Sequence, residues 1–201
     1  RHGLISGATG TGKTVTLKVL TEGLSDAGVP TILADVKGDL ANISKPGEMN
    51  DKLNSRLEEL GISNFDFKNY PVNMWDIYDE KGIPLRVTVS EMGPLMLANI
   101  LDLNDTQAGV LNIIFKVADS EGLLLIDLKD LKQMINFVGE NRDEISRTYG
   151  NVASQSLSAI SRKLLFIEDA GGDLFFGEPA IDIGDFIRTD PSGKGVVNIL
   201  N

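Results

Sequence analysis

The sequence predicts an α/β fold with a mainly parallel sheet, and three observations lead to this prediction. A phosphate-binding motif near the N-terminus lies between an apolar run and a helical stretch. A second apolar run follows, which completes a βαβ unit whose strands should lie parallel in one sheet. Helical periodicity then dominates residues 91–170. We therefore expect a core of residues 1–90 and 171–201 with a helical insertion at residues 91–170.

The motif matches the P-loop pattern G-x-x-x-x-G-K-[ST] at every fixed position. Its glycines let the backbone curl around a phosphate, and the helix that follows adds the positive end of its dipole. Lys13 is then expected to reach the β- and γ-phosphates, and Thr14 to offer a hard oxygen to Mg²⁺. The predicted nucleotide-binding residues are Gly7, Ala8, Thr9, Gly10, Thr11, Gly12, Lys13, Thr14 and Val15.

Periodicity and turn residues give the remaining elements of the core. We expect a strand before the loop at Leu4 and Ile5, and helices at residues 13–27 and 49–60. Further strands are expected at residues 31–35, 72–77 and 85–90, the last two joined as a hairpin through residues 79–82. Residues 195–201 also have the composition of a strand.

Four helices are expected in the insertion, at residues 95–103, 106–118, 128–138 and 152–167. Asp105, Asp127 and Asn151 stand where N-caps belong. Glycines stand where these helices should end, at positions 122, 139, 171 and 172.

Acidic residues follow the second predicted strand at its carboxyl end, where open α/β sheets bind ligands. Asp35 and Asp39 are therefore candidates to contact Mg²⁺ or its water shell, and with Lys13 they form the predicted catalytic set. A charged turn with Gly38 at positive φ explains the same residues without catalysis. Both interpretations stay open for Asp35, and the turn is favoured for Asp39.

A Walker B strand, apolar and ending in Asp-Glu, is the second part that hydrolysis requires. Residues 123–127 match it weakly, because Leu128 follows Asp127 where Glu is expected. We favour helix capping for Asp127 and place the Walker B strand beyond residue 201.

Other chemically interesting residues have structural explanations. His2 is the only histidine and is expected at the surface. Trp75 is expected in the core rather than stacked on a base. The sequence pattern does not support an arginine finger. The basic residues of the predicted insertion are expected on solvent-exposed helix faces: Arg142, Arg147, Arg162 and Lys163.

Composition narrows the classes of partner. The net charge is −10 and the pI about 4.6, which argues against a broadly basic nucleic-acid surface. The chain has no cysteine, which excludes disulfides and thiolate metal sites and fits a reducing cytoplasm. No apolar run approaches the roughly 20 residues of a membrane span. We expect a soluble, cytoplasmic protein without membrane contact, and we interpret the two ends as those of a fragment.

Several segments carry a family resemblance. Residues 1–14 and 34–40 resemble the bacterial HerA-like P-loop ATPases, and the DUF853 group in particular. Residues 101–105, 109–115, 123–131 and 175–179 are similar to that group as well. The resemblance spans essentially the whole chain, and these longer segments are more specific than the P-loop.

The resemblance implies a RecA-like P-loop NTPase core with a helical insertion, which binds ATP and Mg²⁺. Relatives in the HerA and FtsK superfamily couple ATP hydrolysis to movement of double-stranded DNA, and many act as hexamers. A homo-oligomer and duplex DNA are therefore the expected partners. The alternative function is a nucleotide-gated scaffold or assembly switch with little turnover. A small-molecule phosphotransferase also shares the P-loop, but no pattern identifies an acceptor pocket.

Overall fold

The computed structural model describes residues 2–78 and 80–200, and the chain divides into two compact units. The first, which we call the sheet unit, comprises residues 2–76, 81–83 and 182–200 among those described. The second, the helical unit, comprises residues 77–78, 80 and 84–181. The chain thus leaves the sheet unit after residue 83, builds the helical unit, and returns at residue 182 to complete the sheet.

The sheet has four strands in the order β1-β4-β2-β3. These are β1 (Thr31–Ala34), β2 (Val72–Asp76), β3 (Ile83–Pro84) and β4 (Val197–Leu200). The central strand β4 runs parallel to both neighbours, and Val197 stands opposite Thr31 on one side and Val72 on the other. The predicted α/β fold with a parallel sheet is confirmed. β3 lies next to β2 in the sheet. It comprises Ile83–Pro84 and not the predicted residues 85–90, and the turn expected at residues 79–82 includes residue 79, which lies outside the described residues.

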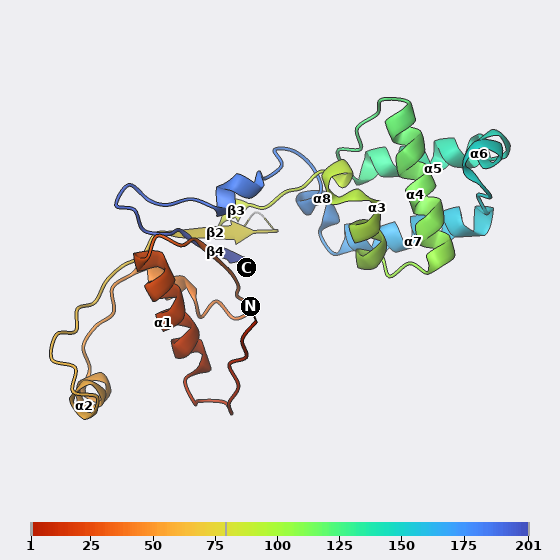
Figure 1. Cartoon of the computed structure of the whole chain (residues 1–201). Helices are drawn as coiled ribbons and strands as arrows, with labels where there is room; N and C mark the ends of the chain where they lie inside the picture. Colours follow the sequence, from red (N-terminus) through yellow and green to blue (C-terminus); the bar gives the residue numbers. More distant parts are fainter. Residues whose placement is uncertain (1, 79, 201) are drawn as a thin grey trace. The chain divides into compact units, whose positions relative to one another are not determined.

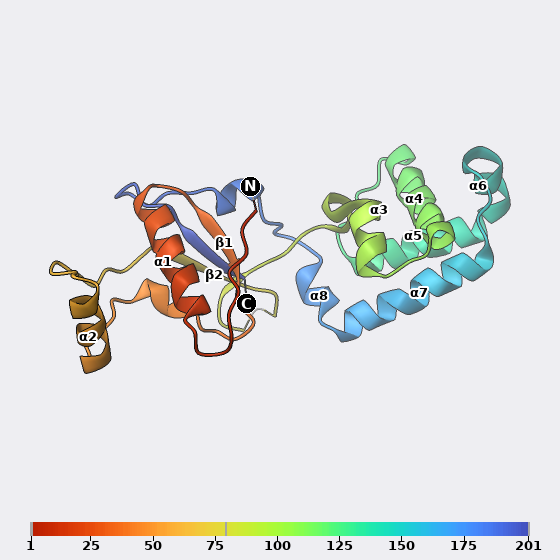
Figure 2. The same cartoon turned by 60° about the horizontal axis from the view of Figure 1, so that its bottom comes forward.

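Helix α1 (Lys13–Asp26) packs on this sheet, and Figure 2 shows it beside β1 and β2. Leu17 of α1 contacts a small apolar core formed by Leu40, Val197 and Ile199. Because β1 begins only a few residues after α1 ends, it runs back along the helix. The carboxyl ends of the parallel strands therefore lie toward the N-terminus of α1. The shorter helices of the unit are η1 (Ala41–Ser44), α2 (Asp51–Glu59) and η2 (Ile183–Phe186).

The last turn of α1 is joined to the chain just before β4. Ser25 donates its hydroxyl to the carbonyl of Gly195 at 2.6 Å, and the Gly195 N–H donates to the Ser25 carbonyl at 2.8 Å. A Cβ at position 195 would lie 2.2 Å from the carbonyl carbon of Val29. Only glycine permits this approach between two backbones. The contact fixes α1 against the strand that completes the sheet.

Two predicted strands are wrong. Leu4 and Ile5 belong to no strand, and Leu4 is 89% exposed. Two apolar residues flanked by glycine and serine offer little apolar surface to bury. The partner of β1 in the sheet is β4. Residues 85–90 alternate apolar and polar side chains as a strand does, but Thr88 and Glu91 form a capping box that begins a helix at Val89. The local capping signal prevails over the short alternation.

The helical unit contains α3 (Val89–Ile100), α4 (Asp105–Ser120), α5 (Leu128–Glu140), α6 (Arg142–Tyr149), α7 (Ser154–Asp169) and α8 (Gly172–Phe175) (Figure 1). It holds the larger apolar core, in which Leu111, Ile114, Leu128, Leu131 and Leu164 are fully buried. The four predicted helices correspond to α3, α4, α5 and α7, whereas α6 was not predicted. Within the described residues, no helix is both long and apolar enough to cross a membrane.

The predicted helix ends are partly confirmed. Asp127 caps α5, and its carboxylate accepts the N–H groups of Lys129 and Asp130 at 2.8 and 3.0 Å. The cap of α4 is Asn104 rather than Asp105, because Asn104 forms a capping box with Gln107. The N-cap position of α7 is Ala153 rather than Asn151. Gly139 lies inside α5 instead of ending it.

We expect Gly195→Ala to destabilise the sheet unit by about 1–3 kcal/mol, the usual cost of overpacking, because the new methyl group meets the backbone of Val29. Urea unfolding followed by the fluorescence of Trp75, the only tryptophan, measures this unit. The matched control is Gly23→Ala in α1, where a Cβ meets nothing within 4 Å and should stabilise the helix by up to about 1 kcal/mol. Equal effects at the two positions would contradict the backbone contact.

Candidate functional site: the phosphate loop and its surroundings

The loop of residues 7–12 leads directly into α1 through a left-handed N-cap. Gly12, the N-cap residue, has φ 91°, and Gly10 has φ 85°. A side chain at either position would be strained, so glycine is needed for this path. Thr11 closes the loop internally, since its hydroxyl donates to the Ala8 carbonyl at 2.8 Å.

Lys13 turns its side chain back over the loop. Its ammonium group donates to the carbonyl oxygens of Gly7 and Ala8 at 2.6 and 2.8 Å. Two hydrogen bonds to one short loop hold the positive charge over the loop and beside the first turn of α1. The P-loop motif predicts a lysine that reaches a phosphate from such a place.

The N-terminus of α1 is suited to an anion. The first N–H groups of a helix have no acceptor within the helix, and here no side chain caps them. The first turn also carries no acidic residue, so nothing opposes the positive end of the helix dipole. Thr14 lies in this turn and is exposed. The open helix end, the lysine and the hydroxyl fit a magnesium-bound triphosphate.

Asp35 and Asp39 lie in the loop after β1, but they differ in their surroundings. Asp35 is 6% exposed, and its carboxylate accepts the N–H groups of Lys37, Asp39 and Leu40 at 3.3, 3.2 and 2.7 Å. Both of its oxygens are thus engaged in shaping a turn in which Gly38 has φ 74°. Asp39 is exposed on the same turn. The structure brings the two residues together, with Asp35 as the residue that organises the loop.

The structure also places the other sequence candidates. Trp75 is buried, donates its indole N–H to the Asn198 side chain at 2.9 Å and packs on Phe186, so the core interpretation is confirmed. His2 is exposed, as expected. Arg142 pairs with the adjacent Asp143, and Lys163 bonds to the Asp102 carbonyl. Across residues 2–78 and 80–200, no group of three or more His, Cys, Asp or Glu side chains could hold a metal ion.

A cavity of about 410 Å³ lies beside α1 in the sheet unit, and we call it the α1 cavity. Its lining comes from α1, η1, α2 and the segment before β2, and includes Val15, Lys18, Asn42, Phe65 and Phe67. Apart from Val15, sequence analysis did not select these residues. Asn42 lies in the short helix η1 and the two phenylalanines lie in an irregular segment. None belongs to a motif, so only the folded chain reveals that they line one cavity.

Lys68 and Tyr70, which both line the α1 cavity, form a polar cluster with Asp26. The Tyr70 hydroxyl and the Lys68 ammonium donate to the Asp26 carboxylate at 3.2 and 3.3 Å. Burial, and then the charge of Asp26, raise the pKa of Tyr70 to about 12. Burial tends to raise the pKa of Asp26, but the bonds from Lys68 and Tyr70 outweigh it and lower that pKa. Burial, followed by the charge of Asp26, raises the pKa of Glu22.

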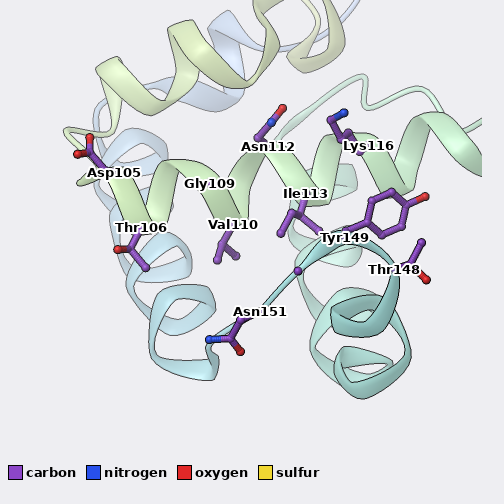
Figure 3. Close-up of a pocket in the computed structure, with 11 residues that line it drawn as sticks. Asp105, Thr106, Gly109, Val110, Asn112, Ile113, Lys116, Thr148, Tyr149 and Asn151 are labelled. Atoms are coloured by element: carbon purple, nitrogen blue, oxygen red, sulfur yellow. The ribbon is translucent and has the colours of Figure 1, made fainter.

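The helical unit has a cavity of its own, of about 510 Å³, between α4 and the link from α6 to α7 (Figure 3). Among its lining residues only Asp105 and Lys116 carry charge. They stand at opposite ends of the exposed face of α4 in Figure 3, and eleven helical residues correspond to roughly 16 Å. Two charges so far apart do not form a catalytic pair.

A parallel sheet, a helix with an open N-terminus and a lysine folded over a glycine loop are features expected of a nucleotide-binding α/β protein. The family described as helicase HerA-like C-terminal matches residues 1–201. The chain therefore belongs to this family, which places it among ATPase- and helicase-related proteins. Neither the curated proteins nor the solved structures contain a match.

We expect Asp35→Ala to lower the free energy of unfolding by about 1–3 kcal/mol, since it leaves buried backbone N–H groups without an acceptor. Asp35→Asn, which keeps one acceptor oxygen, should cost less. Asp39→Ala, an exposed control on the same turn, should change stability by no more than about 0.5 kcal/mol. Urea unfolding monitored at Trp75 compares the three variants. A harmless Asp35→Ala would show that the carboxylate does not organise the loop.

Proposed function

We propose that this chain is the ATP-binding part of a HerA-like P-loop ATPase of the DUF853 group, and that it binds ATP with Mg²⁺. The observation that carries the proposal is the placement of Lys13, whose ammonium is held over the glycine loop beside the uncapped start of α1. Bound Mg²⁺ would supply charge neutralisation at the β- and γ-phosphates. The sheet unit is then the RecA-like NTPase core, and the helical unit is its insertion.

Each residue of the site has a proposed role. The loop N–H groups from Gly7 to Val15 surround the phosphates, Lys13 neutralises charge on the γ-phosphate, and Thr14 ligates Mg²⁺. Asp39 contributes to the water shell of the ion, and Asp35 holds the turn that carries Asp39. The burial and three accepted hydrogen bonds of Asp35 support this division of roles.

By family membership we also propose assembly into a homo-oligomer, with a hexamer as the expected form, and coupling of ATP hydrolysis to movement of double-stranded DNA. The net charge of −10 supplies no broad attraction for DNA phosphates. DNA contacts must then come from a local surface or from the geometry of the oligomer.

The alternative function is a nucleotide-gated assembly switch that binds ATP and turns it over slowly. The three backbone N–H bonds of Asp35 are compatible with this alternative as well, because they give the carboxylate a structural role in the loop. In the switch, the helical unit is the surface that recognises a partner protein.

We expect Lys13→Ala to weaken ATP binding by about tenfold or more, since a charged hydrogen bond contributes about 1.5–3 kcal/mol and each 1.4 kcal/mol is a factor of ten. Isothermal titration with ATP and Mg²⁺ measures the change. Lys116→Ala, an exposed lysine of the helical unit, is the control and should bind as the unchanged chain does. Unchanged affinity in Lys13→Ala would refute the proposed nucleotide site.

Turnover separates the motor from the switch. A motor should hydrolyse ATP faster when duplex DNA is added at about 50 mM salt, where phosphate contacts are strong, and the stimulation should fall steeply as salt increases. A switch should stay near the unstimulated GTPase scale of about 10⁻⁴ s⁻¹ with or without DNA. Steady-state phosphate release by a protein that includes the expected Walker B strand measures both, with Lys13→Ala as the background. Tight ATP binding without DNA-stimulated turnover would contradict the motor.

A further inference from the structure

The α1 cavity begins where the phosphate site ends. Val15 lines it and directly follows Thr14, and the lining continues along one face of α1 through Lys18, Val19 and Glu22. Seven helical residues span roughly 10 Å. The volume of about 410 Å³ lies within the range of about 300–1,000 Å³ that is usual for small-molecule sites. A ligand with its phosphates at the loop can therefore extend into this cavity.

The wall opposite α1 offers an aromatic surface. Phe65 is 40% exposed, and its ring meets that of Phe67 edge to face, with centroids 5.1 Å apart. Phe67 is held in turn by the loop at Gly47, where a Cβ would come within 2.8 Å of the ring. An accessible ring supported by a fixed one is a platform on which a nucleobase can stack.

The polar lining suits a base that is attached to phosphates. The Lys18 ammonium donates to the side-chain oxygen of Asn42 at 3.4 Å, and the NH₂ group of the same side chain is the kind of donor that ring nitrogen atoms accept. Three lysines line the cavity against two acids, Glu22 and Asp66, in a chain whose net charge is −10. Asp26, which lies outside the lining, offsets Lys68, so the cavity has no excess of negative charge next to the predicted phosphate site.

We propose that the α1 cavity is the base subsite of the nucleotide site, with the purine stacked on Phe65 and its edge bonded to Asn42. This inference rests on the proposed function, because the cavity is useful to a nucleotide only if the triphosphate lies at the loop. It adds specific residues, Phe65, Phe67 and Asn42, that lie outside the P-loop motif.

The test compares ATP with inorganic tripolyphosphate, which has the phosphates but no base. In isothermal titrations of the 201-residue chain with Mg²⁺, Phe65→Ala should weaken ATP binding about tenfold, within the range measured for base stacking, and leave tripolyphosphate binding unchanged. Phe65→Leu keeps apolar packing without a ring and should lose ATP affinity in the same way. Phe65→Tyr keeps the ring and should retain it. Phe166→Ala, 72% exposed on α7, is the matched control and should change neither.

The outcomes separate the two proposals. Loss of affinity for both ligands in Lys13→Ala, with ATP affinity unchanged in Phe65→Ala and Phe65→Leu, overturns the base subsite and leaves the phosphate site intact. Unchanged affinity for both ligands in Lys13→Ala overturns the proposed function itself. An equal loss for ATP and tripolyphosphate in Phe65→Leu also overturns the base subsite, because stacking cannot affect a ligand without a base.

Discussion

The parallel pairing of β4 between β1 and β2 is the constraint on which the sheet unit depends. Without Val197–Leu200, β1 and β2 have no strand between them, since each pairs with β4 in parallel register. The same strand supplies Val197 and Ile199 to the small core under α1. The contact between Ser25 and Gly195 then fixes the last turn of the helix. The position of the phosphate loop, at the other end of α1, follows from a strand that lies more than 180 residues further along the chain.

This dependence explains how the chain is divided. The polypeptide leaves the sheet unit after β3 and returns for β4, so the helical unit is an excursion between two strands of one sheet. The helical unit has its own extensive core, from Val89 to Phe176, whereas the sheet unit buries few large apolar side chains. We infer that the helical unit contributes more apolar burial, and that the stability of the phosphate site rests on a few backbone contacts and a short central strand.

Whether a feature could be predicted from sequence depends on how far apart along the chain the residues that determine it lie. The path of residues 7–12 into α1 was predictable because its requirements are local: Gly10 and Gly12 at positive φ and a helix that begins at Lys13. Asp127 was predictable as a cap for the same reason. The strand predicted at residues 85–90 was wrong because two local signals competed there, and the capping box of Thr88 prevailed. The strand at Leu4 and Ile5 was wrong because pairing, which decides whether a short apolar run becomes a strand, is not local.

The α1 cavity and the role of Asp35 also depend on contacts that are not local in the sequence. Asp35 was predicted at the correct end of the sheet, but sequence could not say that its carboxylate points inward to backbone N–H groups rather than outward to a metal. Phe65 and Asn42 have no sequence signal at all, because they meet only when the segment before β2 folds back against η1 and α1. Under the proposed function, the motif locates the phosphates of the nucleotide, whereas the proposed base surface depends on tertiary structure. Under that proposal, selectivity among nucleotides resides in residues outside the P-loop motif.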